Sequence, residues 1–519
     1  MSRHRCLSLF AIAATIGLSA CRAGPGGSTA SPSAPALATS LPGTAALPAP
    51  GLNNFAWDDR SPFRAGLVMS QQAVLDGLPG ATVYHIAITL TESLDAVQGH
   101  EAVQFTNATG APLDQVVFHL YPNLLAGSIA ISNTTVDDAA ATPRLDQRGT
   151  LLRVPLAKML PPNGHVVLAM DFQVAVPHDL QRNYGVFAYN QNILALSHFY
   201  PMVAEYDQRG WNIEIPAPIG DLTYSDPAFY LVQVRAPARP VVAASGSLIG
   251  RQAVEGGQVL TFAAGPARDF YLSISPDTIV VSDTIGEITV NSYAPAGREG
   301  AAKAALAVAE AALQDYGARY GPYPYTQLDV VATSTLALGI EYPGIIAITL
   351  RAYDPAGDSG NNSVATIRES TVAHEVGHQW FYNMVGNDQL DEPWLDESLV
   401  QYITWRYYAH RYGQGGSDGF RQSLEARLKG VDKPNMAIDL PVSAYTAAEY
   451  GAIVYGRGPL FYDALAQMLG PTKMDAFLAD YERTYQWKMA TTAGLKHVAE
   501  QECGCDLTPL FQAWIYPKT

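Results

Sequence analysis

Two histidines and a glutamate fall within five consecutive positions, in a stretch that reads TVAHEVGHQWF from residue 371 to residue 381. On a helix, His374 and His378 share one face, so both imidazoles can bind one metal ion. Glu375 lies about 100° further round the helix, where its carboxylate can accept a proton from a water on that ion. The spacing therefore predicts a hydrolytic metal site. The alternative is two histidines that simply pack on a helix face.

A catalytic zinc ion needs a third protein ligand and an open fourth position. The stretch DEPWLDESLVQY supplies three carboxylates at the start of the next helical segment, namely Glu392, Asp396 and Glu397. Eighteen residues separate His378 from Glu397, which is enough for one helix to end and a second helix to return to the same ion. Spacing alone leaves all three carboxylates as candidates.

These segments resemble the gluzincin metallopeptidases, in which an HExxH motif is followed after eighteen residues by a glutamate. VAHEVGHQWFYNMVGN resembles the zinc helix of the aminopeptidase N branch, and WLDES stands where that family usually has Trp-Leu-Asn-Glu-Gly. The resemblance implies a single zinc ion with three protein ligands: His374, His378 and Glu397. It also implies that Glu375 is the general base. Asp396 and Ser398 depart from the family pattern, so hydrogen bonding around the ligands is expected to differ there.

A second stretch, LGIEYPG at residues 338–344, resembles the exopeptidase motif Gly-x-Met-Glu-Asn of the same family. The resemblance places Gly339 and Glu341 at the substrate. Glu341 would pair with the free α-amine of a peptide and so fix how many residues precede the scissile bond. The alternative is an ordinary glutamate at the end of a strand.

A third stretch, YGRG at residues 455–458, resembles the family's Tyr-x-Lys-Gly motif, with Arg in place of Lys. The resemblance implies that Tyr455 donates its hydroxyl to the oxyanion that develops during peptide hydrolysis. Tyr450 lies five positions earlier and is the competing candidate. Either tyrosine could instead be a core aromatic residue.

Strand patterns dominate the first half of the chain. In VYHIAITL, every second residue from Tyr84 to Leu90 is apolar, as a half-buried strand requires. Similar runs continue to about residue 285 without a helical period. They predict an N-terminal antiparallel β-sandwich-like domain at residues 56–290.

Helical patterns take over near residue 298 with an Ala-rich run of high helix propensity. One strand-like run, QLDVVAT, follows, and the later segments are mostly helical, among them 363–384, 395–412 and 416–429. With the family resemblance, this predicts a thermolysin-like catalytic domain at residues 291–519, mixed α/β at first and mainly helical afterwards. Near its end, the sequence CGC could close a short disulfide between Cys503 and Cys505.

The N-terminal residues predict export. Residues 1–21 combine Arg3 and Arg5, an apolar run and small residues, which is typical of a signal peptide. The run ends in LSAC, which resembles the bacterial lipobox and implies lipidation of Cys21; the alternative is a plain signal peptide. Residues 22–55 are rich in Ala, Pro, Gly and Ser and predict a disordered tether. We therefore expect a membrane-anchored lipoprotein that faces the periplasm or the cell exterior.

The overall composition narrows the possible partners. The 519 residues carry a formal net charge of −16, so no basic surface is expected for nucleic acid. The motifs predict a zinc aminopeptidase that acts on peptides with a free N-terminus. Two alternatives remain: a zinc hydrolase of other specificity, either an endopeptidase or an epoxide hydrolase, and a surface binding protein with a vestigial zinc site. The sequence does not predict an oligomeric state.

Overall fold

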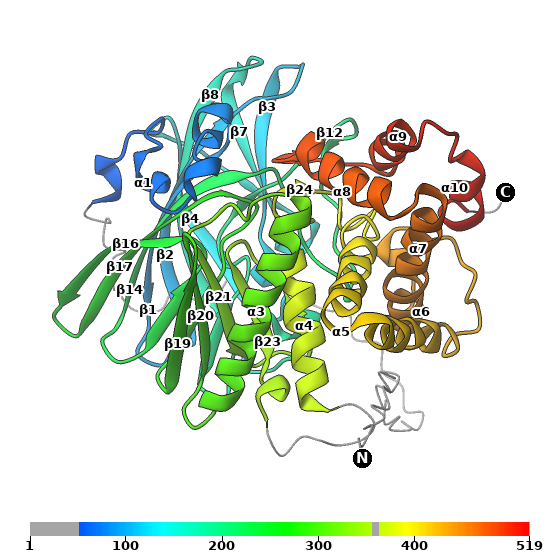
Figure 1. Cartoon of the computed structure of the whole chain (residues 1–519). Coiled ribbons are helices and arrows are strands. Elements are labelled where there is room, and N and C mark those ends of the chain that lie inside the picture. Colours follow the sequence, from blue (N-terminus) through cyan, green and yellow to red (C-terminus); the bar gives the residue numbers. More distant parts are fainter. Residues whose placement is uncertain (1–50, 355–362, 518–519) are drawn as a thin grey trace, which may run out of the picture.

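The structure is a computed structural model that describes residues 51–354 and 363–517 (Figure 1). The predicted signal peptide, the predicted lipidation site Cys21 and nearly all of the predicted tether lie outside the described residues. Among the helices of the described ranges, none is both long enough and apolar enough to cross a membrane.

A mixed eight-stranded sheet organises the first half of the chain. Its strand order is β16-β17-β14-β1-β2-β8-β4-β5, and β1 pairs with β14 in parallel whereas the other neighbours are antiparallel. In β2, buried residues alternate strictly with partly exposed ones, because successive side chains point to opposite faces. The bounds in sheet order are Ser247–Val254, Gly257–Ala267, Ala228–Pro237, Val83–Leu90, Ala96–Thr106, His165–Ala175, Ser128–Val136 and Ala139–Ala140.

Smaller sheets complete this β-rich half. One has the order β15-β18-β10-β9, with bounds Val241–Ala244, Leu272–Ser275, Ile193–Leu196 and Phe187–Asn190. Another has the order β11-β3-β7-β6, with bounds Met202–Val203, Leu113–His119, Leu151–Leu160 and Arg144–Asp146. A hairpin joins β12, Tyr206–Asp207, to β13, Gly210–Trp211. Two short helices, α1 at Ser61–Arg64 and α2 at Val74–Gly77, precede β1.

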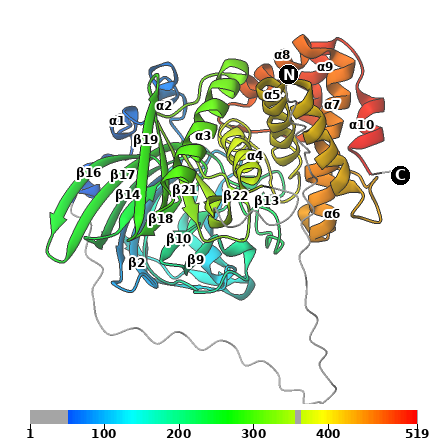
Figure 2. The ribbon, with the colours of Figure 1, turned by 60° about the horizontal axis from the view of Figure 1, so that its bottom comes forward.

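The second half begins with a five-stranded sheet of order β19-β20-β21-β23-β22. The bounds in this order are Thr278–Ile285, Ile288–Pro295, Gln327–Thr333, Ile345–Thr349 and Gly339–Ile340. The division that the sequence suggested at residue 290 thus falls inside β20. Helix α3, Glu299–Tyr320, packs on this sheet and against α4, Val364–Gly377 (Figure 2). The short strand β22 lies at the edge of the sheet and contacts α4.

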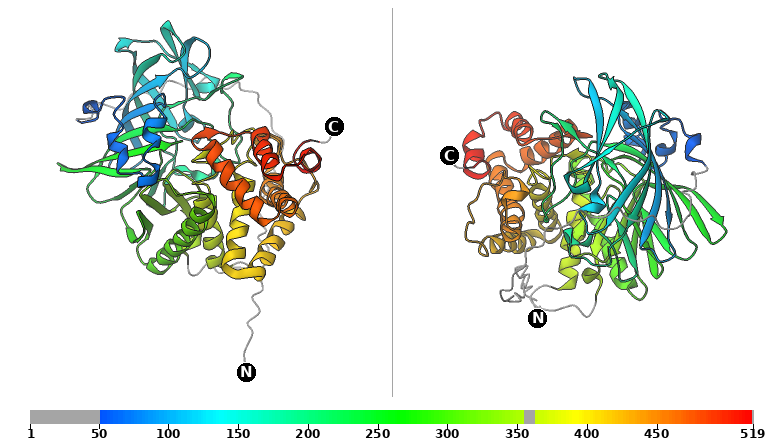
Figure 3. Two further views of the ribbon diagram at one scale, coloured as in Figure 1. Left: turned by 45° about the horizontal axis from the view of Figure 1, so that its top comes forward. Right: turned by 180° about the vertical axis from the view of Figure 1, so that it is seen from behind.

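Helices form the rest of the molecule, on the side opposite the β-rich half (Figures 1 and 3). They are α5 (Glu397–Leu428), α6 (Ala447–Ala452), α7 (Gly458–Leu469), α8 (Pro471–Tyr485), α9 (Thr492–Cys503) and α10 (Thr508–Trp514). A π-helical turn, η8 at Ile453–Arg457, connects α6 to α7. The short strands β24, Val385–Gly386, and β25, Lys488–Met489, pair in parallel. Cys503 and Cys505 form a disulfide.

Helix boundaries differ from the sequence-based ones at two places. The helix predicted to run to residue 384 ends at Gly377, because the chain turns back after His378 and pairs Phe381 with Val385. The segments predicted at 395–412 and 416–429 are one element, α5, with a non-helical residue at Gly413. Its φ of 66° lies in the left-handed region that glycine adopts without steric cost.

Arg268 joins the two halves of the molecule. This buried side chain comes from the β-rich half and donates to the carbonyl of Ser225 in the same half. It also donates to the carbonyls of Tyr382, at 2.6 Å, and of Lys488, at 2.9 Å, in the second half. A Cβ at Gly386 would overlap its guanidinium group. One fully buried, multiply bonded cation therefore helps to fix the relative position of the two halves.

Candidate metal centre and active site

The end of α4 and the first residue of α5 bring three ligand atoms together. His374 Nε2 lies 3.1 Å from Glu397 Oε2 and 3.2 Å from His378 Nε2. His378 Nε2 lies 3.5 Å from the same carboxylate oxygen. The three side chains thus form a group that can hold one cation between them.

Local hydrogen bonds orient these ligands. Nδ1 of His378 lies 3.0 Å from the carbonyl of Phe381, so its Nε2 is left for an ion. Asp396 caps the N-terminus of α5, where its carboxylate accepts the backbone N–H of Glu397 at 2.8 Å. Ser398 donates to the carbonyl of Val454 at 2.6 Å and so ties the start of α5 to the π-helical turn. Asp396 and Ser398, which depart from the family pattern, both act on the position of the third ligand.

The charges around the ligands indicate that a cation belongs there. Burial, and after it the Glu341 carboxylate, raise the pKa of Glu375 well above its ordinary value. Burial lowers the pKa of His378, but the carboxylates of Glu341 and Glu397 outweigh burial and raise it to about 10. Around the ligands, buried carboxylates therefore outnumber the side chains that can carry a positive charge. Two imidazole nitrogens and one carboxylate are also a typical ligand set for catalytic zinc, so the residues fit one zinc ion.

The proposed base lies against the edge strand. Glu375 is buried, and a Cβ on Gly339 would overlap its carboxylate. Only glycine leaves room for this close approach of α4 to β22. Gly339 therefore serves the site by making space for the base rather than by touching substrate through a side chain.

Glu341 lies two residues further along the same edge. Its Oε1 accepts from Gln389 Nε2 at 3.1 Å, and the same amide nitrogen donates to Asp396 Oδ2 at 2.7 Å. Gln379 holds the following turn, since it donates to the carbonyl of Tyr342 and accepts from the N–H of Gly344. Glu341 is thus buried and fixed in position next to the metal ligands, as a binding group for an ammonium must be.

The two candidate tyrosines both line the cavity, but their contacts differ. The hydroxyl of Tyr455 donates to Glu397 Oε1, which places it at the ligand group. The ring of Tyr450 lies 5.6 Å from the ring of Tyr455, and its hydroxyl lies close to Gly220. Tyr455 is part of the π-helical turn, an irregularity that occurs frequently at functional sites.

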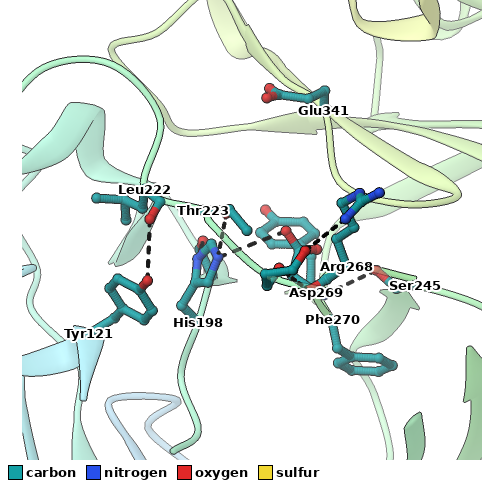
Figure 4. Close-up of polar contacts among 12 residues, drawn as sticks. Tyr121, His198, Leu222, Thr223, Ser245, Arg268, Asp269, Phe270 and Glu341 are labelled. Carbon is teal, nitrogen blue, oxygen red and sulfur yellow. Dashed lines mark hydrogen bonds and ion pairs between the residues drawn. The ribbon is translucent and has the colours of Figure 1, made fainter. Parts of the chain in front are cut away.

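A cavity of about 260 Å³ connects these groups. Its lining comes from both halves of the molecule and includes Asp221, Glu341, Glu375, His374, Glu397, Arg427, Tyr450 and Tyr455. A second, much smaller cavity of about 20 Å³ adjoins Glu341 and is lined by Asp221, His198 and Asp269, among others. Figure 4 shows Glu341 together with His198 and Asp269. It is large enough for about one water. The end of the site next to Glu341 is therefore rich in hydrogen-bond acceptors.

Sequence reasoning missed Asp221 and Gln389. Burial, followed by Glu341 and Glu397, raises the pKa of Asp221 well above its ordinary value, and its side chain lies within hydrogen-bonding reach of Glu397. Both residues lie outside the motifs along the chain, so no local spacing marks them. Glu392, a candidate third ligand on chemistry alone, instead accepts the backbone N–H of Thr492 at 2.9 Å.

Comparisons with known proteins agree with this geometry. Residues 304–514 match the profile described as the peptidase family M1 domain. The chain carries an M1 peptidase domain of the aminopeptidase N-like gluzincins. The M1 domain covers α4, α5 and the π-helical turn, so it contains the ligand group, the base and Tyr455.

The similarity to curated relatives extends beyond the residues that match the M1 domain. Aminopeptidase M1 of Arabidopsis thaliana is 24% identical over 80% of this chain and 49% of its own length. Aminopeptidase M1-B of Oryza sativa subsp. japonica is 27% identical over 48% of this chain and 31% of its own. The chain thus spans less than half of the length of these curated relatives.

Solved structures show the same fold. The M1 zinc metallopeptidase of Deinococcus radiodurans has a TM-score of 0.63 at 20% identity and covers 85% of this chain and 94% of its own. A mutant form of that protein, bound to a Tyr-ser-ala substrate, has the same TM-score, and the match covers 96% of its chain. The predicted order of a β domain followed by a mixed and then helical catalytic domain is confirmed.

Loss of a hydrogen-bond partner of a metal ligand typically lowers metal affinity by about 10- to 100-fold. We predict that Glu397→Gln lowers the zinc affinity by more than this, because a direct ligand is lost. Zinc per chain, measured by mass spectrometry after dialysis against a competing chelator, is the readout. Glu392→Gln is the matched control and should retain zinc. Zinc loss from the control but not from Glu397→Gln would show that the ligand assignment is wrong.

Proposed function

We propose that this chain is a zinc-dependent aminopeptidase that releases N-terminal residues from peptides. The observation that carries the proposal is the placement of two carboxylates, Glu341 and Asp221, in the same cavity as the ligand group and Glu375. A free α-amine is positively charged at neutral pH and binds between such carboxylates. A blocked N-terminus has no charge to offer them.

Each side chain of the site has a separate role in the proposed reaction. Bound zinc would polarise the scissile carbonyl and lower the pKa of a water, which is the chemistry that the protein groups alone cannot supply. Glu375 accepts a proton from the attacking water and passes it to the nitrogen of the leaving amine. Tyr455 donates a hydrogen bond to the carbonyl oxygen as that oxygen gains negative charge. Glu341 and Asp221 hold the α-amine so that one residue precedes the cleaved bond.

The first test compares substrates with free and blocked N-termini. We predict that the purified chain hydrolyses alanine p-nitroanilide but not its N-acetyl derivative, and that a chelator abolishes the activity. Glu375→Gln should lower kcat by about 10²- to 10⁴-fold, because the proton acceptor is lost, while the zinc content stays unchanged. Cleavage of blocked peptides would instead favour the endopeptidase alternative. Retention of full rate in Glu375→Gln would contradict the role of the base.

The second test separates the two tyrosines. Tyr455→Phe removes the hydroxyl next to the ligand group, so we predict a fall in kcat of about 10²- to 10³-fold with little change in KM. Tyr450→Phe is the matched control on the preceding helix and should lower kcat by less than about tenfold, because Glu397 accepts a hydrogen bond from the hydroxyl of Tyr455 and not from that of Tyr450 within the described residues. A larger effect at Tyr450 than at Tyr455 would reverse the assignment of the oxyanion donor.

We also propose that the chain is an exported lipoprotein, anchored to a membrane through an acylated Cys21. The support is the sequence alone: an apolar run after Arg3 and Arg5 that ends in LSAC. We predict that bacteria expressing the full chain incorporate labelled palmitate into it and that Cys21→Ser abolishes the label and releases the protein from the membrane fraction. Equal membrane retention of Cys21→Ser would contradict the anchor.

A further inference from the structure

Arg427 stands out among the residues that line the cavity of the M1 domain. It lies in the last turn of α5, and it is the single lysine or arginine within the described lining of this cavity. Phe420 and Ser423, which lie seven and four positions earlier, share its face of the helix and line the cavity with it. The end of α5 thus brings one permanent positive charge to the substrate space.

Among the described residues, no acidic side chain forms an ion pair with this guanidinium. In the described ranges, the side chain of Arg427 makes no ion pair and no hydrogen bond, and its Nε is shielded from solvent without a partner. Other arginines of the same helix are paired: Arg406 binds Asp475, and Arg421 binds Glu425 and Asp463. A guanidinium nitrogen held out of water without a hydrogen-bond partner costs free energy. We therefore expect the guanidinium to bind a ligand.

The position of Arg427 is complementary to that of the amine-binding group. Its guanidinium carbon lies 6.0 Å from the centre of the Tyr455 ring. Glu341, Asp221 and Arg427 all line the cavity that holds the ligand group. A molecule in this cavity therefore meets carboxylates and one guanidinium.

A dipeptide in its zwitterionic form has this charge distribution. Its α-amine and its α-carboxylate lie on the two sides of the one peptide bond to be cleaved. The cavity of about 260 Å³ is slightly smaller than the usual range for ligand sites, which suits a short peptide. A planar guanidinium binds a carboxylate through two parallel hydrogen bonds and so fixes its direction as well as its charge.

We propose that Arg427 binds the carboxylate of the residue that leaves, so that the preferred substrates are dipeptides with a free C-terminus. The proposal rests on the proposed aminopeptidase activity and adds the substrate class. Arg427 is a substrate-binding residue here and takes no part in proton transfer. Its rival role, support of Tyr455 through the ring contact, would affect every substrate to the same degree.

The test uses the zinc-loaded full chain and compares kcat/KM for Ala-Ala with that for Ala-Ala amide, which differ only in the carboxylate. We expect the free acid to be preferred by about 10- to 100-fold, as for other charge-assisted hydrogen bonds. In Arg427→Met the ratio of the two values should fall to about one, mainly through KM for the free acid, because the cation that distinguishes the two substrates is gone. Arg427→Lys, which keeps the charge but not the planar fork, should restore part of the ratio.

Arg421→Met is the matched control, because Arg421 lies on the same helix but in exposed ion pairs. Arg421→Met should keep the wild-type ratio of kcat/KM for the free acid to kcat/KM for the amide. Melting temperatures of all variants check that the fold is retained, and Arg427→Lys keeps the test valid if Arg427→Met is unstable. Equal kcat/KM for acid and amide in the wild type would overturn the proposal, and so would an equal loss for both substrates in Arg427→Met.

Hydrolysis of alanine p-nitroanilide separates this proposal from the proposed function. If the wild type cleaves the anilide but does not distinguish acid from amide, the proposed aminopeptidase activity is supported and the proposed role of Arg427 is wrong. If the wild type cleaves neither the anilide nor the dipeptide, both the proposed activity and the proposed role of Arg427 are wrong.

Discussion

Repulsion among buried carboxylates is the constraint on which the structure of this site depends. Glu341, Glu375, Asp396 and Glu397 are all buried, and three of them belong to two groups of possible metal ligands that share His378. Charges this close in a poorly hydrated interior repel strongly, so protons or a divalent ion must neutralise them. The surrounding hydrogen bonds do not remove this charge. They hold the carboxylates in place, with Gln389 between Glu341 and Asp396, so that an ion finds its ligands preorganised.

The β-rich half contributes to the same site and is not only a support. It brings Tyr184 and Asp221 into the lining of the cavity, across from the helices that carry the ligands and Tyr455. Their position depends on Arg268, which binds backbone carbonyls on both sides of the junction. Because an unpaired guanidinium or an unpaired carbonyl would be costly there, the junction favours one arrangement of the two halves. The shape of the substrate cavity is thus set partly by a residue that does not line it.

Local spacing predicted some of this site and could not predict the rest. The two histidines and Glu375 follow from the period of a single helix, and the alternation of apolar residues predicted strands of the β-rich half. The choice of Glu397 over Glu392 came from a family resemblance, because both lie within reach of the ion along the chain. Glu392 binds Thr492, one hundred residues away, which no local pattern reveals. Asp221 and Arg427 likewise enter the cavity through tertiary packing alone.

In the proposed aminopeptidase reaction, the contact between strand β22 and helix α4 also accounts for cleavage after a single residue. Gly339 has no side chain, so the carboxylate of Glu375 lies directly against it. Glu341 follows two residues later, and two residues of extended chain span about 7 Å. The separation between the proposed proton acceptor and the proposed amine-binding carboxylate is therefore set by the backbone at the end of one short edge strand. A larger residue at position 339 would displace Glu375 and change this separation, so in the proposed reaction a glycine without any substrate contact helps to define the position of cleavage.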